Sequence, residues 1–205
     1  GRTSSREVIL LDRLREVAMG RHEDARAEMR RAQQLDPLAP KIIANVGWIL
    51  SFARRNDEAL KELHKARKLL PEEYYVRELM GIAYLGGGAK AEAIREFEEA
   101  TTLSGGFWQE MGWLGYAYAV AGKRREAERV LAQLQKLSKQ RFVSPYNMAM
   151  ICAGLGEKDR AFAWLEKTYQ QHGERLLYLK VDPAFDSLRS DPRFQDLLRR
   201  VGLPP

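Results

Sequence analysis

The sequence predicts an all-α fold built from a row of helical hairpins, on three observations. The chain of 205 residues repeats its pattern every 34 residues without an insertion or deletion. Within each period, apolar and small residues recur three and four positions apart, which is the spacing of one helix face. A turn signal marks the middle of each period. Units of this length bury one another's apolar faces by stacking, so the expected architecture is an α-solenoid.

The second helix of each unit is marked by an alanine. A large apolar residue follows it four positions later, so the two lie on one helix face. The alanines are Ala25, Ala59, Ala93, Ala127 and Ala161, and the large residues are Met29, Leu63, Phe97, Leu131 and Leu165. Five positions before each alanine, a turn is predicted at Gly20, Arg54, Gly88, Gly122 and Gly156.

The first helix of each unit carries a tiny residue at a fixed position. These residues are Gly47, Gly81, Gly115 and Ala149. A glycine inside a helix costs about 0.5–1 kcal/mol relative to alanine. Close approach of the partner helix must offset this cost, because a position without a bulky side chain lets two helices pack tightly. Prolines that suit a first helical turn separate the units, at Pro37, Pro40, Pro71 and Pro145.

These patterns resemble the tetratricopeptide repeat (TPR) family. The residues that carry the resemblance are Leu114-Gly115-x-x-Tyr118 followed by Ala127, and Met80-Gly81-x-x-Tyr84 followed by Ala93-x-x-x-Phe97-x-x-Ala100. The resemblance implies a right-handed α-solenoid of four to five TPR hairpins. Four units are expected at 40–73, 74–107, 108–141 and 142–175, after a degenerate N-terminal unit at 1–39. That first unit is degenerate because Asp12, Arg13 and Glu16 stand where the family has Leu, Gly and Tyr.

After the last unit, residues 176–205 are expected to form a C-terminal helical cap. Asp182-Pro183 and Asp191-Pro192 each read as an N-cap followed by a proline at the first helical position, and Gly202 reads as a helix stop. Such a segment covers the apolar face that a solenoid would otherwise expose. This tail resembles the C-terminal ends of TPR regions in multidomain bacterial regulatory proteins, where a winged-helix, cyclase or kinase domain precedes them. We therefore expect the chain to be a piece of a longer protein.

Composition sets broad limits on the class of protein. The chain has 34 Lys and Arg against 28 Asp and Glu, a net charge of +6 with neutral histidines. Its charges are too evenly scattered for a membrane span, so no membrane insertion is expected. One cysteine, Cys152, excludes an intramolecular disulfide. We expect a soluble, folded protein with a cytoplasmic location.

The sequence predicts neither an enzyme nor a cofactor or metal site. The histidines are isolated, and Cys152 has no nearby histidine to activate it. The run Gly86–Gly88 lacks the Lys-Ser/Thr of a phosphate-binding loop, so a turn is the better interpretation. Paired carboxylates such as Glu72-Glu73 and Glu98-Glu99 fit a helix start and a solvated face.

Residues 122–141 form the most basic segment, with seven Lys and Arg against Glu126 and Glu128. A basic surface can bind phosphates or anionic lipid. No stacking pattern of aromatic residues accompanies the charges, so nucleic-acid binding is not expected.

The strongest functional signal follows from the resemblance. In TPR proteins the first helices line a concave groove, and its positions map here onto an aromatic and aliphatic strip with few charges. The residues predicted to bind a protein or peptide partner are Trp48, Tyr75, Leu79, Ile82, Gln109, Trp113, Tyr116, Tyr146, Asn147 and Met150. Exposed Trp and Tyr are typical anchors of protein interfaces.

Three alternatives stay open for this strip. Its side chains can pack between repeats or against the chain's own ends, or the region can act as a spacer or as a self-association element that forms a homodimer. Capture of a chaperone's C-terminal carboxylate is not expected. Lys41 and Asn45 match that group of TPR proteins, but the other positions do not, namely Ala44, Trp48, Glu78 and Gly112.

Overall fold

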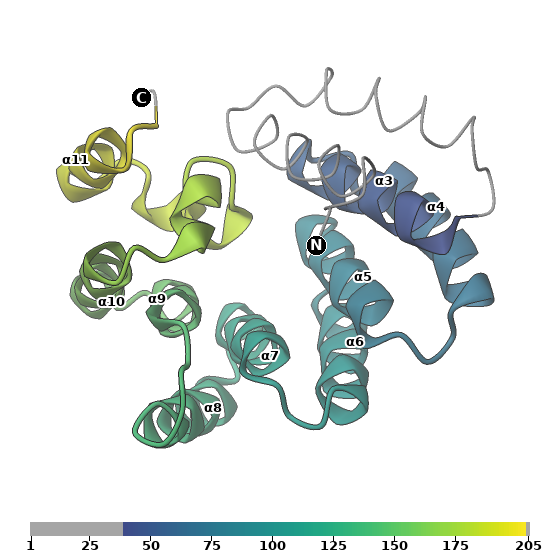
Figure 1. The fold of residues 1–205 in the computed structure, drawn as a ribbon, viewed down its shortest axis with the longest axis horizontal. Helices are drawn as coiled ribbons and strands as arrows, with labels where there is room; N and C mark the ends of the chain where they lie inside the picture. Colours follow the sequence, from purple (N-terminus) through teal and green to yellow (C-terminus); the bar gives the residue numbers. More distant parts are fainter. Residues whose placement is uncertain (1–38, 204–205) are drawn as a thin grey trace, which may run out of the picture.

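Sequential helix pairs make up the part of the chain that the computed structural model describes, residues 39–203 (Figure 1). The pairs are α3 (Pro40–Phe52) with α4 (Asn56–Leu69), α5 (Tyr74–Gly86) with α6 (Lys90–Leu103), α7 (Trp108–Val120) with α8 (Arg124–Leu137), and α9 (Pro145–Gly154) with α10 (Lys158–Gln170). The 3₁₀ helices η1 (Glu174–Tyr178) and η2 (Pro183–Leu188) follow, and α11 (Pro192–Val201) comes last. These residues include no strand, so the predicted all-α repeat fold is confirmed.

The pairs follow one another along an arc (Figure 1). Helices α3, α5, α7 and α9 lie on its inner side, and α4, α6, α8 and α10 lie on its outer side. One pair falls within each of the ranges 40–73, 74–107, 108–141 and 142–175. The predicted unit at 1–39 lies outside the described residues, apart from Ala39. None of the helices within 39–203 has the length and apolar content needed to cross a bilayer.

The predicted close packing of the two helices at positions with small residues is confirmed. All four marker alanines within the described range are completely buried, and so are Leu63, Phe97 and Leu165. A Cβ added to Gly81 would lie 2.6 Å from a ring carbon of Phe97, and one added to Gly47 would lie 2.5 Å from Leu63. Each glycine therefore lets the partner helix approach closely enough to bury a large side chain, and full burial of such a side chain is worth about 1.5–3 kcal/mol.

The turns inside the helix pairs share a left-handed backbone. The φ angles of Gly88, Gly122 and Gly156 are 82°, 78° and 76°. Arg54 occupies the same place before α4 with a φ of 62°. The left-handed conformation costs a residue with a Cβ about 1–2 kcal/mol, which glycine avoids. Arg54 therefore holds a strained position that the other units fill with glycine.

The C-terminal segment contains the helix starts that the sequence predicts at Asp182 and Asp191. The Asp182 carboxylate accepts a hydrogen bond from the Ala184 N–H at 2.9 Å, and Asp191 accepts one from the Arg193 N–H at 3.0 Å. Gly202 ends α11 with a φ of 81°. Both predicted N-caps and the helix stop are confirmed, although the first cap starts a 3₁₀ helix and not an α-helix.

Candidate binding groove

The ten residues of the predicted strip lie on α3, α5, α7 and α9, the inner helices of the arc. Six of them are almost completely buried: Leu79, Ile82, Trp113, Tyr146, Asn147 and Met150. The other four are partly exposed: Trp48, Tyr75, Gln109 and Tyr116. Packing between units causes part of this burial, since the Trp113 ring stacks on Phe97 at 5.9 Å and the Asn147 amide donates to the Gln109 carbonyl at 3.1 Å. Another part of the chain covers the strip from the concave side.

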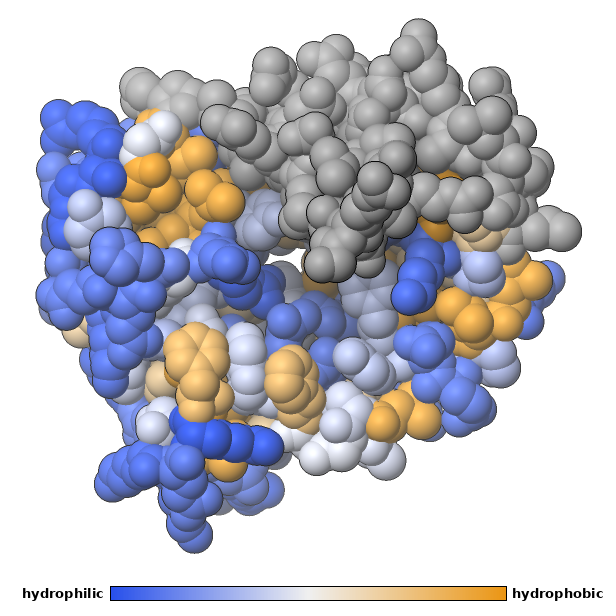
Figure 2. Space-filling model, viewed as in Figure 1, coloured by the Kyte–Doolittle hydropathy of each residue, from blue (hydrophilic) through white to orange (hydrophobic). Residues whose placement is uncertain are grey.

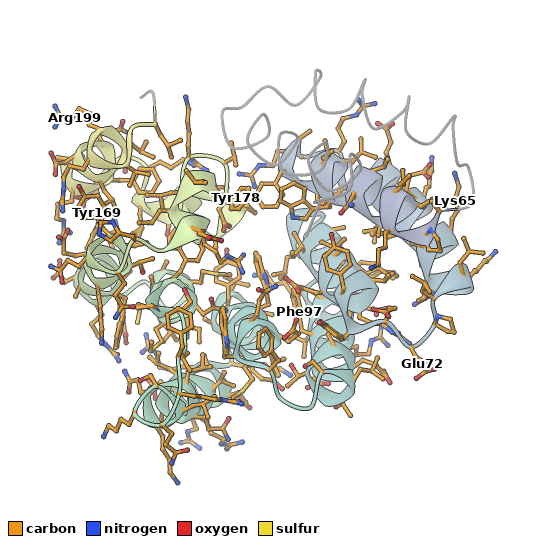
Figure 3. All side chains as sticks on the ribbon, viewed as in Figure 1. Lys65, Glu72, Phe97, Tyr169, Tyr178 and Arg199 are labelled. Carbon is orange, nitrogen blue, oxygen red and sulfur yellow. The ribbon has the colours of Figure 1, made fainter. Side chains whose placement is uncertain are left out.

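The covering segment is Glu174–Leu188, which spans η1 and η2 and is called the strap below. From the strap, Tyr178 reaches towards α3 (Figure 3). Its ring meets Trp48 edge-on, with centroids 5.6 Å apart, and lies 6.3 Å from the ring of Phe52. The strap follows the fourth described helix pair, so this contact spans the groove to the first pair.

In the middle of the groove, the strap places a cation over two strip residues. The guanidinium of Arg175 lies 5.8 Å from the centre of the Trp113 ring and 5.2 Å from that of Tyr146. The Tyr146 hydroxyl donates a hydrogen bond of 2.7 Å to Asp182, and both residues are fully buried. Burial is the main cause that raises the pKa values of Asp182 and Tyr146. Phe185 adds an edge-on contact to Tyr146 at 5.1 Å.

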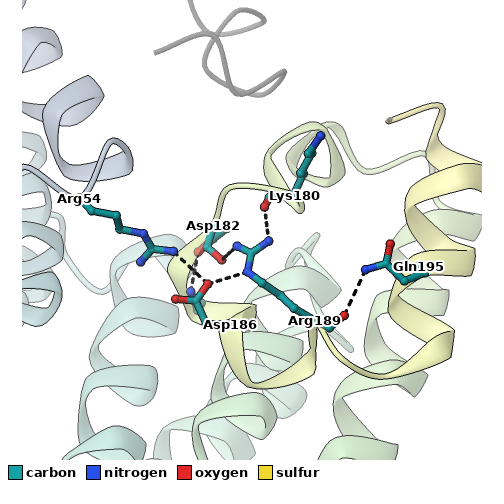
Figure 4. Close-up of polar contacts among 7 residues, drawn as sticks. Arg54, Lys180, Asp182, Asp186, Arg189 and Gln195 are labelled. Atoms are coloured by element: carbon teal, nitrogen blue, oxygen red, sulfur yellow. Dashed lines mark hydrogen bonds and ion pairs between the residues drawn. The ribbon is translucent and has the colours of Figure 1, made fainter. Parts of the chain in front are cut away.

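A cluster of polar side chains connects the strap to the turn before α4 (Figure 4). Arg54 forms an ion pair with Asp186 at 2.9 Å. Arg189 also pairs with Asp186, at 2.7 Å, and donates hydrogen bonds to the backbone carbonyls of Lys180 and Asp182. Arg54, which stands at a turn position where the other described units have glycine, thus contacts the strap directly.

A cavity of about 420 Å³ remains between the inner helices and the strap. Its apolar wall includes Ile82, Leu85, Trp113, Val120 and Pro183. Tyr116, Arg54 and Asp186 add polar groups to the lining. The space-filling view shows a hollow near the middle of the molecule (Figure 2). Burial, followed by the charges of Asp182 and Asp186, raises the pKa of Tyr116, so its hydroxyl keeps its proton and remains a hydrogen-bond donor.

Two carboxylates lie buried beside the strip, a feature that the sequence analysis did not predict. Glu78 accepts two hydrogen bonds from the Gln109 amide, at 3.1 and 3.0 Å. Glu110 is completely buried, and neither of its carboxyl oxygens has a hydrogen-bond partner. Burial and then the nearby charge of Glu78 raise the pKa of Glu110 to about 8. Both causes favour the protonated carboxyl group of Glu110, which can donate a hydrogen bond to Glu78.

The other groups considered for chemistry have structural surroundings. Burial raises the pKa of the Cys152 thiol to about 11, which suppresses the reactive thiolate. Gly88 ends the glycine run in the left-handed conformation of a turn. Within residues 39–203, no three His, Cys, Asp or Glu side chains gather in a way that could hold a metal ion.

Comparison with solved structures defines the class of fold. TTC0263, a thermophilic TPR protein of Thermus thermophilus, superposes with a TM-score of 0.64 at 20% identity, over 85% of this chain and 98% of that chain. A tetratricopeptide repeat protein from Parabacteroides merdae has a TM-score of 0.53 at 14% identity, over 99% and 82%. The Cut9–Hcn1 hetero-tetramer of APC/C has a TM-score of 0.65 at 18% identity, over 97% and 39%.

The chain therefore has the TPR fold, as the sequence predicts. No protein-family model and no curated protein matches the sequence.

Proposed function

We propose that the chain is a non-catalytic module that binds a protein partner by receiving a peptide segment in the cavity between the strap and α5, α7 and α9. The observation that carries this proposal is the composition of the cavity. Its wall combines apolar and aromatic side chains with polar groups, among which Tyr116 and Arg54 bring hydrogen-bond donors to the same space. A concave site in which apolar side chains and fixed polar groups meet is typical of ligand recognition. The fold of TPR proteins fits such a role.

Arg54 supports a functional role for this cavity. Its left-handed backbone costs about 1–2 kcal/mol, which glycine would avoid. The ion pair with Asp186 does not offset that cost, because both side chains are nearly half exposed and such pairs contribute about 0–1 kcal/mol. A gain in binding gives a reason for an arginine at this turn.

The proposed ligand is a peptide with one large apolar side chain. The cavity of about 420 Å³ takes that side chain against Ile82 and Trp113, next to the Tyr116 hydroxyl. Arg54 then meets a carbonyl or carboxylate of the peptide. Of the predicted strip, Ile82, Trp113 and Tyr116 line this cavity, whereas Tyr146, Asn147 and Met150 are fully buried and do not.

The test starts with peptides selected from a displayed random library on the whole chain, and measures their affinity for variants by fluorescence polarisation. Tyr116→Ala should weaken binding by about tenfold or more, the effect of removing an interface anchor. Tyr118→Ala is the matched control, because Tyr118 lies on the same helix but bonds to Glu98 on α6. Equal affinities for both variants would show that the cavity is not the site.

Arg54→Gly separates binding from stability. We expect this variant to unfold at the same or a higher urea concentration than the wild type, because glycine relieves the turn, and to bind the selected peptides more weakly. Unchanged affinity would remove Arg54 from the proposed site.

The alternative of self-association has less support. A homodimer through the aromatic strip would have to displace the strap, whose Asp182 and Phe185 are fully buried. Sedimentation at several concentrations tests this alternative, and a concentration-dependent dimer would favour it. A cytoplasmic location and the role of a module within a bacterial regulatory protein stay predictions.

A further inference from the structure

Three aromatic side chains gather at the connections between units, outside the groove. Phe107 directly precedes α7, Trp108 is the first residue of α7, and Phe142 lies in the loop before α9; together they are called the aromatic edge. Phe142 is 67% exposed and Phe107 is 41% exposed. The Trp108 ring meets Phe142 edge-on at 5.9 Å and lies 5.0 Å from the ring of Phe107. These rings form one patch, although it joins two connections that belong to different units.

Repeat spacing and tight turns hold this patch in place. Trp108 and Phe142 are the first residues of consecutive 34-residue units, so they occupy equivalent places on neighbouring pairs. In the loop that carries Phe142, the Arg141 N–H donates to the Leu137 carbonyl at 3.0 Å, and the next residue, Val143, is buried. The aromatic edge is thus presented by a defined backbone and needs little ordering on binding.

Unpaired cations accompany the rings. Lys136, Lys139 and Arg141 are exposed, and none of their side chains has a hydrogen bond or ion pair with another residue in the described part of the chain. No Asp or Glu occurs between Glu128 and Glu157. The space-filling view shows separate orange side chains over the region of α7 and α8, with blue atoms at the margin of that region (Figure 2). The local surface combines apolar rings with uncompensated positive charge.

We propose that the aromatic edge docks on the surface of an anionic lipid bilayer. Aromatic side chains are favourable at the boundary between headgroups and acyl chains, and each nearby Lys or Arg strengthens attachment to an anionic surface. A side chain that is 67% exposed, that of Phe142, projects from the protein, and this shape fits a soft planar surface better than it fits a peptide groove. Lipid phosphates then pair with Lys139 and Arg141, which have no carboxylate partner in the described part of the chain.

The charges also set the limits of the contact. Tyr74, the first residue of the preceding unit, is 39% exposed, but Glu72 and Glu73 stand directly before it. These carboxylates repel an anionic surface, so the contact is centred on the two later connections. The inner groove lies on other faces of the helices, and membrane docking does not depend on the proposed peptide site.

Flotation of the whole chain with vesicles tests the charges. Vesicles of phosphatidylcholine with about one third phosphatidylserine should bind the protein at low salt, and pure phosphatidylcholine vesicles should bind it far less. Lys139→Glu with Arg141→Glu should lower the partition coefficient by about tenfold or more. Lys61→Glu with Lys68→Glu is the matched control, because it makes the same charge change on exposed residues of α4. Absence of binding at low salt, or equal losses in both double variants, would overturn the proposal.

Two further measurements test the rings. Phe107→Ala with Phe142→Ala should lower partitioning by about tenfold, whereas Leu177→Ala, a control at a 47% exposed residue of η1, should not. Brominated acyl chains should quench fluorescence of the wild type more than that of Trp108→Phe, since Trp108 alone of the four tryptophans belongs to the aromatic edge. Binding to an acidic, Phe-containing peptide in place of vesicles would identify the surface as a protein interface and refute membrane docking.

Discussion

Replacement of Glu110 by Gln should change how stability depends on pH. Burial and Glu78 raise the pKa of Glu110 from 4.5 to about 8. Between these values the folded chain holds a proton that the unfolded chain releases, so the free energy of unfolding falls as pH rises. The slope is about 1.4 kcal/mol per pH unit, and the three pH units from about 5 to about 8 give about 4 kcal/mol. The amide of Glu110→Gln cannot ionise and can still donate to Glu78, so this loss should disappear.

The assay is urea unfolding followed by helical circular dichroism at pH values from about 5 to about 8. Wild type and Glu110→Gln should have similar stabilities at the acidic end of this range, and the variant should be more stable at the basic end. Glu99→Gln, at an exposed position on α6, controls for the loss of one negative charge and should follow the wild type. Parallel curves for wild type and Glu110→Gln would refute the assignment of a buried, protonated carboxyl.

Further substitutions test packing and the strap by the same unfolding assay. Gly81→Ala should cost about 1–3 kcal/mol despite the helix preference of alanine, because the new Cβ would lie 2.6 Å from the Phe97 ring; a gain in stability would contradict the close approach. Tyr146→Phe should cost about 1.5–3 kcal/mol, because the buried Asp182 carboxylate loses a donor at 2.7 Å, and a neutral result would argue against that bond. Phe97→Ala should cost about 3–5 kcal/mol, whereas Phe142→Ala should change stability by less than about 0.5 kcal/mol, so similar losses would contradict their different burial.

The sequence was sufficient to predict the helix pairs because the same residues carry the pattern and the packing. Ala93 and Phe97 recur in register, and they are also the residues that lock α6 against α5. The caps at Asp182 and Asp191 were equally predictable, since a cap depends on residues two positions away. Local chemistry and a short repeat therefore determine most of the fold.

The strap could not be predicted by the same reasoning, because its contacts join distant parts of the chain. Nothing in the spacing of residues 174–188 indicates that Tyr178 lies against Trp48, or that Arg175 lies over Trp113. One signal was present: Arg54 departs from the glycine that other units have at the turn, and it is the residue that pairs with Asp186. This departure from the repeat marks Arg54, but the spacing does not identify Asp186 as its partner.

The buried carboxyl group of Glu110 is the second feature that the repeat pattern does not predict. Glu110 belongs to a helix whose inner face is apolar, and sequence reasoning treats an isolated carboxylate as solvated. Its burial depends on the neighbouring helices and the strap residues that close over α7, so only the assembled molecule shows it. The use of the ten strip residues in binding stays a prediction.

A stack whose units touch only their neighbours can fray from either end, one unit at a time. The bond between Arg54 and Asp186 joins residues 132 positions apart, and Tyr178 joins the same two regions. This link couples the outermost described units to each other. Amide protons of α3 and α9 should therefore exchange with solvent in one concerted opening, and loss of the link should let the two ends open independently.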